Sequence, residues 1–257
     1  MKITALVENT TETDLETEHG LSLFIETDKH TILFDSGQGK LFAENAKKLG
    51  KDLAEVDMMV LSHGHYDHGG GLETFLEIND HAPVYVSSLA FGDYYNAKEK
   101  YIGLDKKLAE SDRLIFTDVD VQLDDEIYIY AASIRKKVTE LGAFGLKMRK
   151  WDVLLPDFFD HEIYLMITEG KKRVLISGCS HKGILNIVEW FRPDVLVGGF
   201  HFSSLALDEK LKGYAEVLAG YDTDYYTCHC TGKEQYEFMR KTMGRLSYLS
   251  EGMSIEL

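Results

Sequence analysis

The residues with the clearest capacity for chemistry are three histidines and one aspartate that are close neighbours in the sequence. His63, His65, Asp67 and His68 follow directly after the apolar run 58–61. Imidazole and carboxylate groups together are ligands that suit zinc, iron or manganese. The cluster therefore predicts a metal site at the end of a strand, where loops carry chemistry. The alternative, a histidine-rich surface loop, is disfavoured because the four side chains come immediately after a buried strand.

The spacing within this cluster favours two ions. His63 and His65 are two positions apart, so in an extended turn their side chains can point the same way. Asp67 and His68 come after the chain has turned, and they can face a second ion. A pair of ions lowers the pKa of a bridging water and generates hydroxide near neutral pH. Asp67 is then also a candidate catalytic residue that orients this water.

The elements that must position these residues follow from the hydrophobic pattern. Strands are expected at 3–7, 21–27, 31–34, 58–61, 84–86, 114–116, 127–131, 163–167, 174–176, 195–197, 225–227, 246–249 and 254–256. Helices are expected at 41–49, 72–78, 105–110, 183–191, 207–218 and 233–242. Two similar halves, each with strands followed by helices, predict an α/β fold in which two sheets pack face to face with helices outside.

The chain of 257 residues shows no repeat and no Pro/Ser-rich linker, which predicts a single domain over 1–257. From about 89 to 159 the pattern becomes less regular. We interpret this stretch as an insertion that borders the active site, with ordinary peripheral core as the alternative.

Composition narrows the class of partner. The net charge of −15 disfavours general binding to nucleic acid, so a small-molecule substrate is expected. The sequence has no apolar run long enough to cross a bilayer and no hydrophobic signal-peptide core, which predicts a cytoplasmic protein without a membrane partner. Three cysteines argue against a disulfide framework and fit a reducing compartment. Whether the chain forms a homo-oligomer is left open.

The pattern His63-x-His65-x-Asp67-His68 resembles the second motif of the metallo-β-lactamase superfamily. Asp35, which comes after the strand at 31–34, resembles the first motif, a structural aspartate beneath the metals. The resemblance extends over essentially the whole chain. It implies an αββα sandwich of two mixed sheets with the site at the sheet edges. It also implies two divalent metal ions, zinc first, with iron or manganese as alternatives.

A narrower resemblance is to the branch that includes the dihydropterin-ribofuranosylaminobenzene-phosphate synthase of methanopterin biosynthesis. The motifs that carry it recur in order: Glu18-His19-Gly20-Leu21-Ser22, Leu33-Phe34-Asp35-Ser36-Gly37, Ser62-His63-Gly64-His65-Tyr66-Asp67-His68, Gly178-Cys179-Ser180-His181, Gly198-Gly199-Phe200-His201 and His229-Cys230-Thr231-Gly232. Many proteins of this branch are described only as metal-dependent hydrolases. The combination is specific to the branch and says much less about the substrate.

Three residues in later motifs are candidates to complete the site. His181 follows a strand and is presented by a glycine-containing loop. His229 matches the superfamily's last histidine ligand. Cys179 occupies the place where relatives carry a carboxylate or thiolate that reaches the metals; a thiolate there would favour zinc, and a buried inert cysteine is equally compatible. The predicted metal ligands are therefore His63, His65, Asp67, His68, His181 and His229.

Other histidines leave alternatives open. His161 lies near the place of the third motif's histidine but lacks the usual glycine–histidine–threonine context, so either His161 or His181 completes the first metal site. His201 ends a strand, and substrate contact, proton transfer and metal ligation are all compatible with it. His19 either faces the site from the other sheet or is a hydrogen-bonded structural residue. Cys228 and Cys230 are expected to project opposite to His229 and to pack.

Three functions are compatible with these residues. The first is hydrolysis of an ester- or phosphate-type small molecule by a metal-bridging hydroxide. The second, which follows from the narrower resemblance, is a pterin-forming condensation. The third is a metal-dependent binding protein without catalysis, which the intact set of ligands disfavours.

Overall fold

Two seven-stranded sheets form the centre of the molecule in the computed structural model, which describes all 257 residues. The first sheet has the order β17 (Ser254–Glu256), β1 (Lys2–Val7), β2 (Ser22–Glu26), β3 (Thr31–Phe34), β4 (Met58–Val60), β5 (Val84–Val86) and β7 (Leu114–Phe116). The second has the order β16 (Leu246–Tyr248), β15 (Asp224–Thr227), β14 (Val195–Gly198), β13 (Lys172–Ile176), β12 (Ile163–Glu169), β9 (Ile127–Ala131) and β8 (Val121–Gln122). Each sheet contains both parallel and antiparallel pairs.

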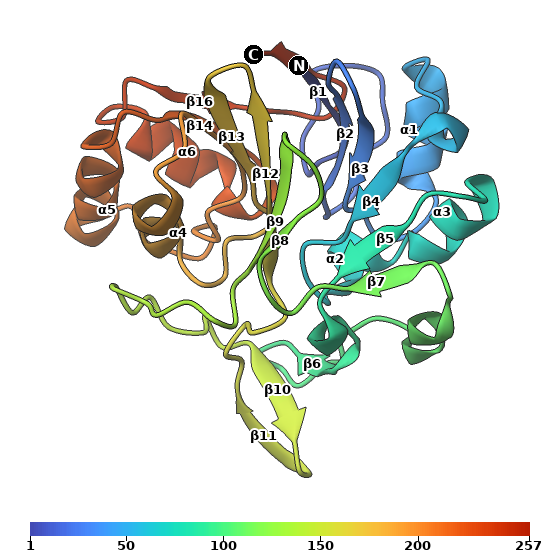
Figure 1. Ribbon diagram of the computed structural model, residues 1–257. Coiled ribbons are helices and arrows are strands. Elements are labelled where there is room, and N and C mark those ends of the chain that lie inside the picture. The colour runs from blue at the N-terminus through green and yellow to red at the C-terminus, as the bar shows by residue number, and fades with distance from the viewer.

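The layers follow from three separate apolar cores. One lies between the two sheets and includes Ile3, Phe34 and Leu165. The second lies under the helices α1 (Leu41–Lys48) and α3 (Leu72–Ile78), which cover the first sheet. The third lies under α4 (Ile184–Phe191), α5 (Glu209–Ala219) and α6 (Lys233–Met239), which cover the second sheet (Figure 1). The predicted αββα sandwich is therefore confirmed. None of these helices has the length and apolarity needed to span a bilayer.

Parallel pairing brings the predicted chemistry to one edge of the sandwich. In the first sheet β3 pairs parallel with β4, and β4 with β5. In the second sheet β13, β14 and β15 are parallel neighbours. The carboxyl ends of parallel strands meet at the same edge of a sheet, so the loops that follow β3, β4, β13, β14 and β15 gather there. These loops carry the motifs described above.

The stretch 89–159 contributes to three sheets. Its strands β7, β8 and β9 extend the two main sheets, whereas β6 (Asp93–Tyr95), β10 (Lys147–Lys150) and β11 (Val153–Pro156) form a small third sheet. The β10–β11 hairpin projects from the body of the molecule in Figure 1. The predicted helix at 105–110 is a 3-10 helix over Lys106–Glu110. The description of the whole stretch as an insertion stays a prediction.

Candidate metal centre

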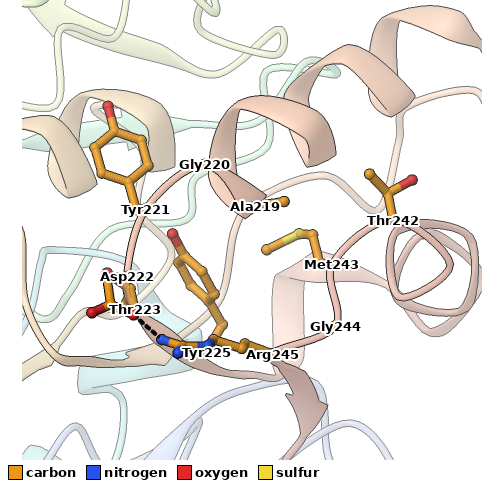
Figure 2. A pocket seen from close by; sticks show the side chains of 10 residues that line it. All are labelled: Ala219, Gly220, Tyr221, Asp222, Thr223, Tyr225, Thr242, Met243, Gly244 and Arg245. Atoms are coloured by element: carbon orange, nitrogen blue, oxygen red, sulfur yellow. Dashed lines mark hydrogen bonds and ion pairs between the residues drawn. The ribbon is translucent and has the colours of Figure 1, made fainter.

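Two of the molecule's cavities differ in the chemistry of their linings. One, of about 390 Å³, lies between the end of α5 and strands β15 and β16 (Figure 2). Its only ionic pair is Asp222 with Arg245. The residues that line it are Ala219, Gly220, Tyr221, Asp222, Thr223, Tyr225, Thr242, Met243, Gly244 and Arg245. None of the predicted site residues is among them.

The other cavity, of about 250 Å³, lies where the site-bearing loops gather. Its lining consists of His19, His65, Tyr66, Asp67, Asn96, Ile102, Leu146, Cys179, His181, His201, Ser203, His229 and Cys230. Three of these, Asn96, Ile102 and Leu146, come from the stretch 89–159. That stretch therefore lines part of this cavity, and its description as an insertion that borders an active site stays a prediction.

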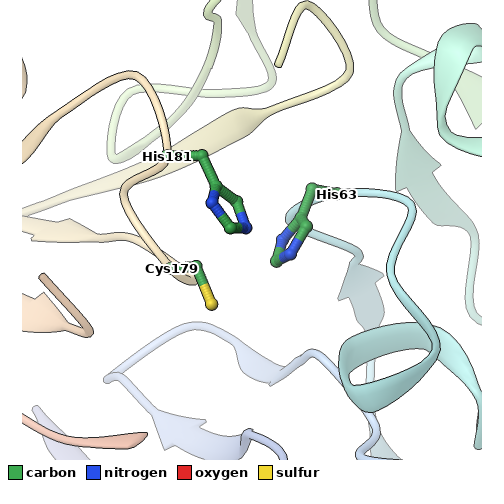
Figure 3. Close-up of side chains that lie close together, drawn as sticks. All are labelled: His63, Cys179 and His181. Carbon is green, nitrogen blue, oxygen red and sulfur yellow. The ribbon is translucent and has the colours of Figure 1, made fainter. Parts of the chain in front are cut away.

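The first group of converging side chains, here called the imidazole pocket, consists of His63, His65 and His181. The ring centroid of His63 lies 4.6 Å from that of His65 and 4.8 Å from that of His181. The rings of His65 and His181 are 4.9 Å apart. Figure 3 shows the His63 and His181 side chains close together, with Cys179 beside them, and the two rings are nearly perpendicular. All three histidines are buried.

The imidazole pocket contains buried ring nitrogens that have no hydrogen-bond partner. These are Nε2 of His63, Nε2 of His65 and both ring nitrogens of His181. A buried polar atom without a partner costs about 1–3 kcal/mol, so such a group requires an explanation. Burial lowers the pKa of all three histidines, which keeps the rings neutral and their lone pairs free. A divalent ion would supply the missing partner, so the pocket fits a metal ion on the chemistry of its donors.

Hydrogen bonds set the tautomer of His63. Ser62 Oγ donates to Asp35 Oδ2 (2.7 Å), so it accepts from Nδ1 of His63, also at 2.7 Å. The proton of His63 is thereby held on Nδ1, and Nε2 is left to face the pocket. Relays of this kind orient histidine ligands in metal sites.

The second group, here called the mixed pocket, consists of Asp67, His68, Cys179 and His229. His68 Nε2 lies 3.1 Å from Cys179 Sγ and 3.2 Å from His229 Nε2. Asp67 Oδ2 lies 3.5 Å from His229 Nε2 and 4.0 Å from His68 Nε2. Tetrahedral zinc with bonds of 2.0–2.3 Å separates its ligands by roughly 3.3–3.8 Å. The mixed pocket therefore fits one ion by spacing as well as by ligand type.

Asp35 supports both pockets from below. It accepts hydrogen bonds from the backbone N–H of Ser62 (2.7 Å) and from Nδ1 of His68 (2.6 Å). Burial acts to lower the pKa of His68, but the Asp35 carboxylate beside it raises that pKa to about 9. Asp67 is the reverse case: burial acts to raise its pKa, and hydrogen bonds from His19 and His229 hold it well below the usual range. Asp35 thus contacts residues that lead into both pockets, and its role beneath two metal ions stays a prediction.

Glu8 and Asn9, which follow β1, hold the His229 loop and were not among the predicted site residues. Asn9 Oδ1 accepts from Nδ1 of His229 (2.8 Å), which leaves Nε2 free to face the mixed pocket. Glu8 Oε1 accepts from the backbone N–H of His229 (2.5 Å). The sequence signal that could have identified Glu8 and Asn9 is their place directly after the strand 3–7, where loops carry functional residues. Their partner lies more than two hundred positions away, which no local pattern reveals.

Glu162 plays the same part for the His181 loop and was also missed. It is fully buried, and its Oε1 accepts from the backbone N–H of His181 (2.7 Å). Its Oε2 accepts from the backbone N–H of Lys182 (3.0 Å). Burial raises the pKa of this carboxyl. The sequence signal was a glutamate directly before an apolar strand. A carboxylate buried at such a place needs hydrogen-bond donors from the protein.

Cys179 lies between the two pockets. Its Sγ comes within 4.8 Å of ligand atoms of His63 and His181 on one side, and of His68 and His229 on the other. Burial raises the pKa of the Cys179 thiol well above its usual value. Its side chain faces ligand atoms of both groups, so the geometry favours the ligand alternative for Cys179 over an inert core residue.

His161 is brought near the cluster, but both of its ring nitrogens are occupied. Nδ1 accepts from the backbone N–H of Gly64 (2.9 Å), so Nε2 carries the proton and faces Asp157 Oδ2 at 3.3 Å. Its ring stacks on Tyr94 with the centroids 4.0 Å apart. The geometry therefore favours His181 over His161 as the third member of the imidazole pocket. Asp157, whose pKa the neighbouring histidines hold low against the opposing effect of burial, was not foreseen.

His19 and His201 line the mouth of the cavity. His19 is half-exposed, and its Nε2 lies 3.2 Å from Asp67 Oδ2. It therefore faces the site from the first sheet, which was one of its two expected positions. The ring centroid of His201 lies 4.3 Å from that of His181. Nδ1 of His201 is buried without a partner.

The expectation that Cys230 projects away from the site is wrong. The alternation of a strand ends with β15, and His229–Thr231 form a 3-10 turn that directs Cys230 into the cavity. Ligand atoms of Cys230, Cys179 and His201 lie within 4.8 Å of one another. Cys228 packs in the core between the sheets, as expected.

Several residues of these loops have a left-handed backbone although they are not glycine. The φ angles are +59° at Asp35, +57° at Ser180, +56° at His201 and +46° at His229. This conformation is costly for residues with a side chain and persists where the surroundings enforce it, above all at functional sites.

Gly64 is required at its position because there is no space for a side chain. A Cβ there would lie 1.9 Å from the carbonyl oxygen of Ala90.

Known proteins resemble this chain in sequence and in fold. A sequence model of the metallo-beta-lactamase superfamily matches residues 16–219. An uncharacterised protein of Methanocaldococcus jannaschii is 31% identical over 245 residues, which cover 90% of each chain. The 7,8-dihydropterin-6-methyl-4-(beta-D-ribofuranosyl)-aminobenzene-5'-phosphate synthase of the same organism is 29% identical over 93% of this chain and 90% of that protein. The crystal structure of a metal-dependent hydrolase of the beta-lactamase superfamily superposes with a TM-score of 0.83 and 27% identity over 100% of this chain and 99% of that one. Both resemblances expected from the motifs are confirmed.

Proposed function

The chain belongs to the metallo-β-lactamase superfamily, whose members are mostly metal-dependent hydrolases, and we propose that it is a dinuclear enzyme of this kind. One ion would be held by the imidazole pocket of His63, His65 and His181. The other would be held by the mixed pocket of Asp67, His68 and His229, with Cys179 between the two. Zinc is the favoured metal because the set combines imidazoles with a thiol, and iron or manganese are the alternatives.

One observation carries the proposal: buried imidazole nitrogens converge from two sheets and have no protein partner. Hydrogen bonds to Asp35 and Asn9 turn the outer nitrogens of His68 and His229 away from the pocket. A fold that only needed these side chains as core would leave no such atoms unpaired, because each costs stability. Bound ions would give these nitrogens the partners that the protein lacks and so offset the cost of burying them.

The reaction we propose is attack of water on an ester- or phosphate-type small molecule. Two ions at these positions would supply Lewis acidity and a hydroxide at neutral pH. Asp67 is placed to orient the attacking water, since its Oδ2 faces the cavity between His19 and His229. His201 at the cavity mouth is placed to contact the substrate or to move a proton to the leaving group.

The partner we propose is a small molecule, because the lining of the cavity encloses about 250 Å³. The net charge of −15 disfavours nucleic acid as a partner. The three cysteines form no disulfide, in keeping with a reducing compartment such as the cytoplasm.

A second function, condensation of the kind performed by the dihydropterin-aminobenzene-phosphate synthase, is favoured by the 29% identity to that protein over 93% of this chain. A catalytically silent metal-binding protein is disfavoured, because none of the predicted ligands is replaced. The first two functions share the metal centre and differ in the substrate and in the reaction.

The test is metal analysis of the purified protein, followed by assays on a panel of esters and phosphodiesters and on pterin substrates. We expect two equivalents of metal, and hydrolysis that a chelator abolishes and added Zn²⁺ restores. Condensation without hydrolysis would select the synthase. Two equivalents of metal without turnover of any substrate would select the binding protein.

A further inference from the structure

A third group of potential ligands lies beside the two pockets, and one of its members, Cys230, has no part in the proposed reaction. It consists of Cys179, His201 and Cys230, here called the soft pocket. Their ligand atoms lie within 4.8 Å of one another. The thiol of Cys230 donates to the carbonyl oxygen of Cys179 at 3.5 Å. Both cysteines are buried, and Nδ1 of His201 has no hydrogen-bond partner.

The chain makes room for Cys230 at this place. A Cβ on Gly199 would lie 2.3 Å from the Cys230 sulfur, so a larger residue at position 199 would displace the thiol. Cys228, two positions earlier, packs among apolar residues between the sheets. The two cysteines therefore have different surroundings, and only Cys230 lines the cavity.

The donors of the soft pocket determine which cations it can bind. Its two sulfurs and one ring nitrogen lie within 4.8 Å of one another. Two sulfurs and an imidazole are a soft set of ligands, which selects Zn²⁺, Cd²⁺ or Cu⁺ over Mn²⁺ or Mg²⁺.

We propose that Cys179, Cys230 and His201 form a third metal site, specific for thiophilic cations, which shares the Cys179 sulfur with the mixed pocket. Binding at this site forms bonds from the ion to both sulfurs and to a ring nitrogen of His201, and any thiol proton is released to water. The proposal rests on the proposed function only where Cys179 is shared. An ion held here engages His201, so that His201 no longer contacts substrate. Excess thiophilic metal therefore inhibits the enzyme.

The test is a metal titration of the metal-free full-length protein with Cd²⁺ and, separately, with Mn²⁺. Bound metal is measured after gel filtration, and thiolate-to-cadmium charge transfer is followed by ultraviolet absorption. We expect three equivalents of Cd²⁺ and two of Mn²⁺. Cys230→Ser is expected to bind two equivalents of Cd²⁺ with weaker charge-transfer absorption. Cys228→Ser is the matched control and is expected to behave as the wild type.

His201→Asn provides a second variant, because asparagine tolerates the left-handed backbone at this position. It is expected to lose the third equivalent of Cd²⁺ as Cys230→Ser does, with circular dichroism confirming the fold of each variant. Two equivalents of Cd²⁺ in the wild type, with absorption unchanged by Cys230→Ser, would overturn the third site and leave the dinuclear centre intact. Failure of the wild type to bind the first two equivalents would instead contradict the proposed function.

Discussion

The imidazole pocket and the mixed pocket share Cys179 and lie side by side, but they differ in charge and in how their ligands are held. The imidazole pocket offers three neutral rings, and four of their nitrogens are buried without partners. The mixed pocket combines a carboxylate, a thiol and two imidazoles. In the mixed pocket both imidazoles are anchored at their outer nitrogens, His68 by Asp35 and His229 by Asn9.

The two pockets also differ in how the buried polar atoms are paired when no metal is bound. In the mixed pocket the ligand groups are hydrogen-bond partners of one another, since His68 Nε2 contacts Cys179 and His229. The imidazole pocket has no such network, so the burial of its unpaired nitrogens costs free energy that no hydrogen bond offsets. When ions are bound, the carboxylate and a thiolate of the mixed pocket neutralise one dication locally, whereas the imidazole pocket leaves its ion with the full charge. In the proposed centre, the ion of the imidazole pocket would therefore polarise water more strongly than the ion of the mixed pocket.

The largest expected effect comes from removing one ligand from each pocket. We expect His63→Ala to lose the ion of the imidazole pocket and Asp67→Ala to lose that of the mixed pocket. Each variant then binds one equivalent of metal, and activity falls more than about 100-fold because both ions are needed. Metal analysis after loading with Mn²⁺, which the soft pocket is not expected to bind, and the hydrolysis assay measure these losses.

His81→Ala, which changes a half-exposed histidine in a turn, is the matched control and is expected to keep both ions. Circular dichroism checks that every variant is folded. Two equivalents of metal in His63→Ala would show that the imidazole pocket is not a metal site. Loss of both ions in either variant would show that the two pockets are not independent.

Whether a feature of the two pockets can be predicted from the sequence depends on how far apart the interacting residues are along the chain. His63, His65, Asp67 and His68 are neighbours in the chain, and the apolar run before them predicted the strand β4 that presents them. The strand pattern likewise predicted the αββα sandwich, because the period of each apolar run is a local property.

The parts that were missed depend on contacts across the fold. Asn9 and His229 meet only because β1 and β15 end at the same edge of the sandwich. The choice between His161 and His181 required the contact of His161 with Gly64, which lies in the loop after β4 of the first sheet. Cys230 was assigned to the wrong side because a 3-10 turn replaced the expected strand alternation.

Protons provide the next test of the comparison. Burial lowers the pKa of His63 and His181, so the imidazole pocket binds metal without releasing protons. In the mixed pocket Asp35, against the effect of burial, raises the pKa of His68 to about 9, and burial raises that of the Cys179 thiol. Metal must displace both protons there, so affinity is expected to rise about 100-fold per pH unit between roughly pH 6 and 8.

The two single-ion variants isolate these affinities. His63→Ala reports on the mixed pocket and Asp67→Ala on the imidazole pocket, each measured by competition with a chelating dye at several pH values. Calorimetry in buffers of different ionisation enthalpy counts the protons released. An equal dependence on pH in both variants would contradict the assigned difference between the pockets.

The smallest effect concerns Asn9, which acts on the mixed pocket alone. Asn9 Oδ1 accepts the Nδ1 proton of His229 and so directs Nε2 toward Asp67 and His68. Asn9→Ala removes this acceptor, and we expect metal affinity of the mixed pocket to fall about 10–100-fold. Affinity of the imidazole pocket should stay unchanged. Chelator competition in the His63→Ala and Asp67→Ala backgrounds measures the two separately.

Asn9 also accepts from the backbone N–H of Gly20, so a structural contribution must be separated from the positioning of His229. Asn9→Asp retains an oxygen that accepts from both groups and is expected to restore the affinity. Equal weakening of both pockets by Asn9→Ala would indicate a general loosening of the loop. Selective weakening that Asn9→Asp reverses would instead show that one acceptor atom, from the loop after β1, sets the tautomer of a ligand in the loop after β15 of the opposite sheet.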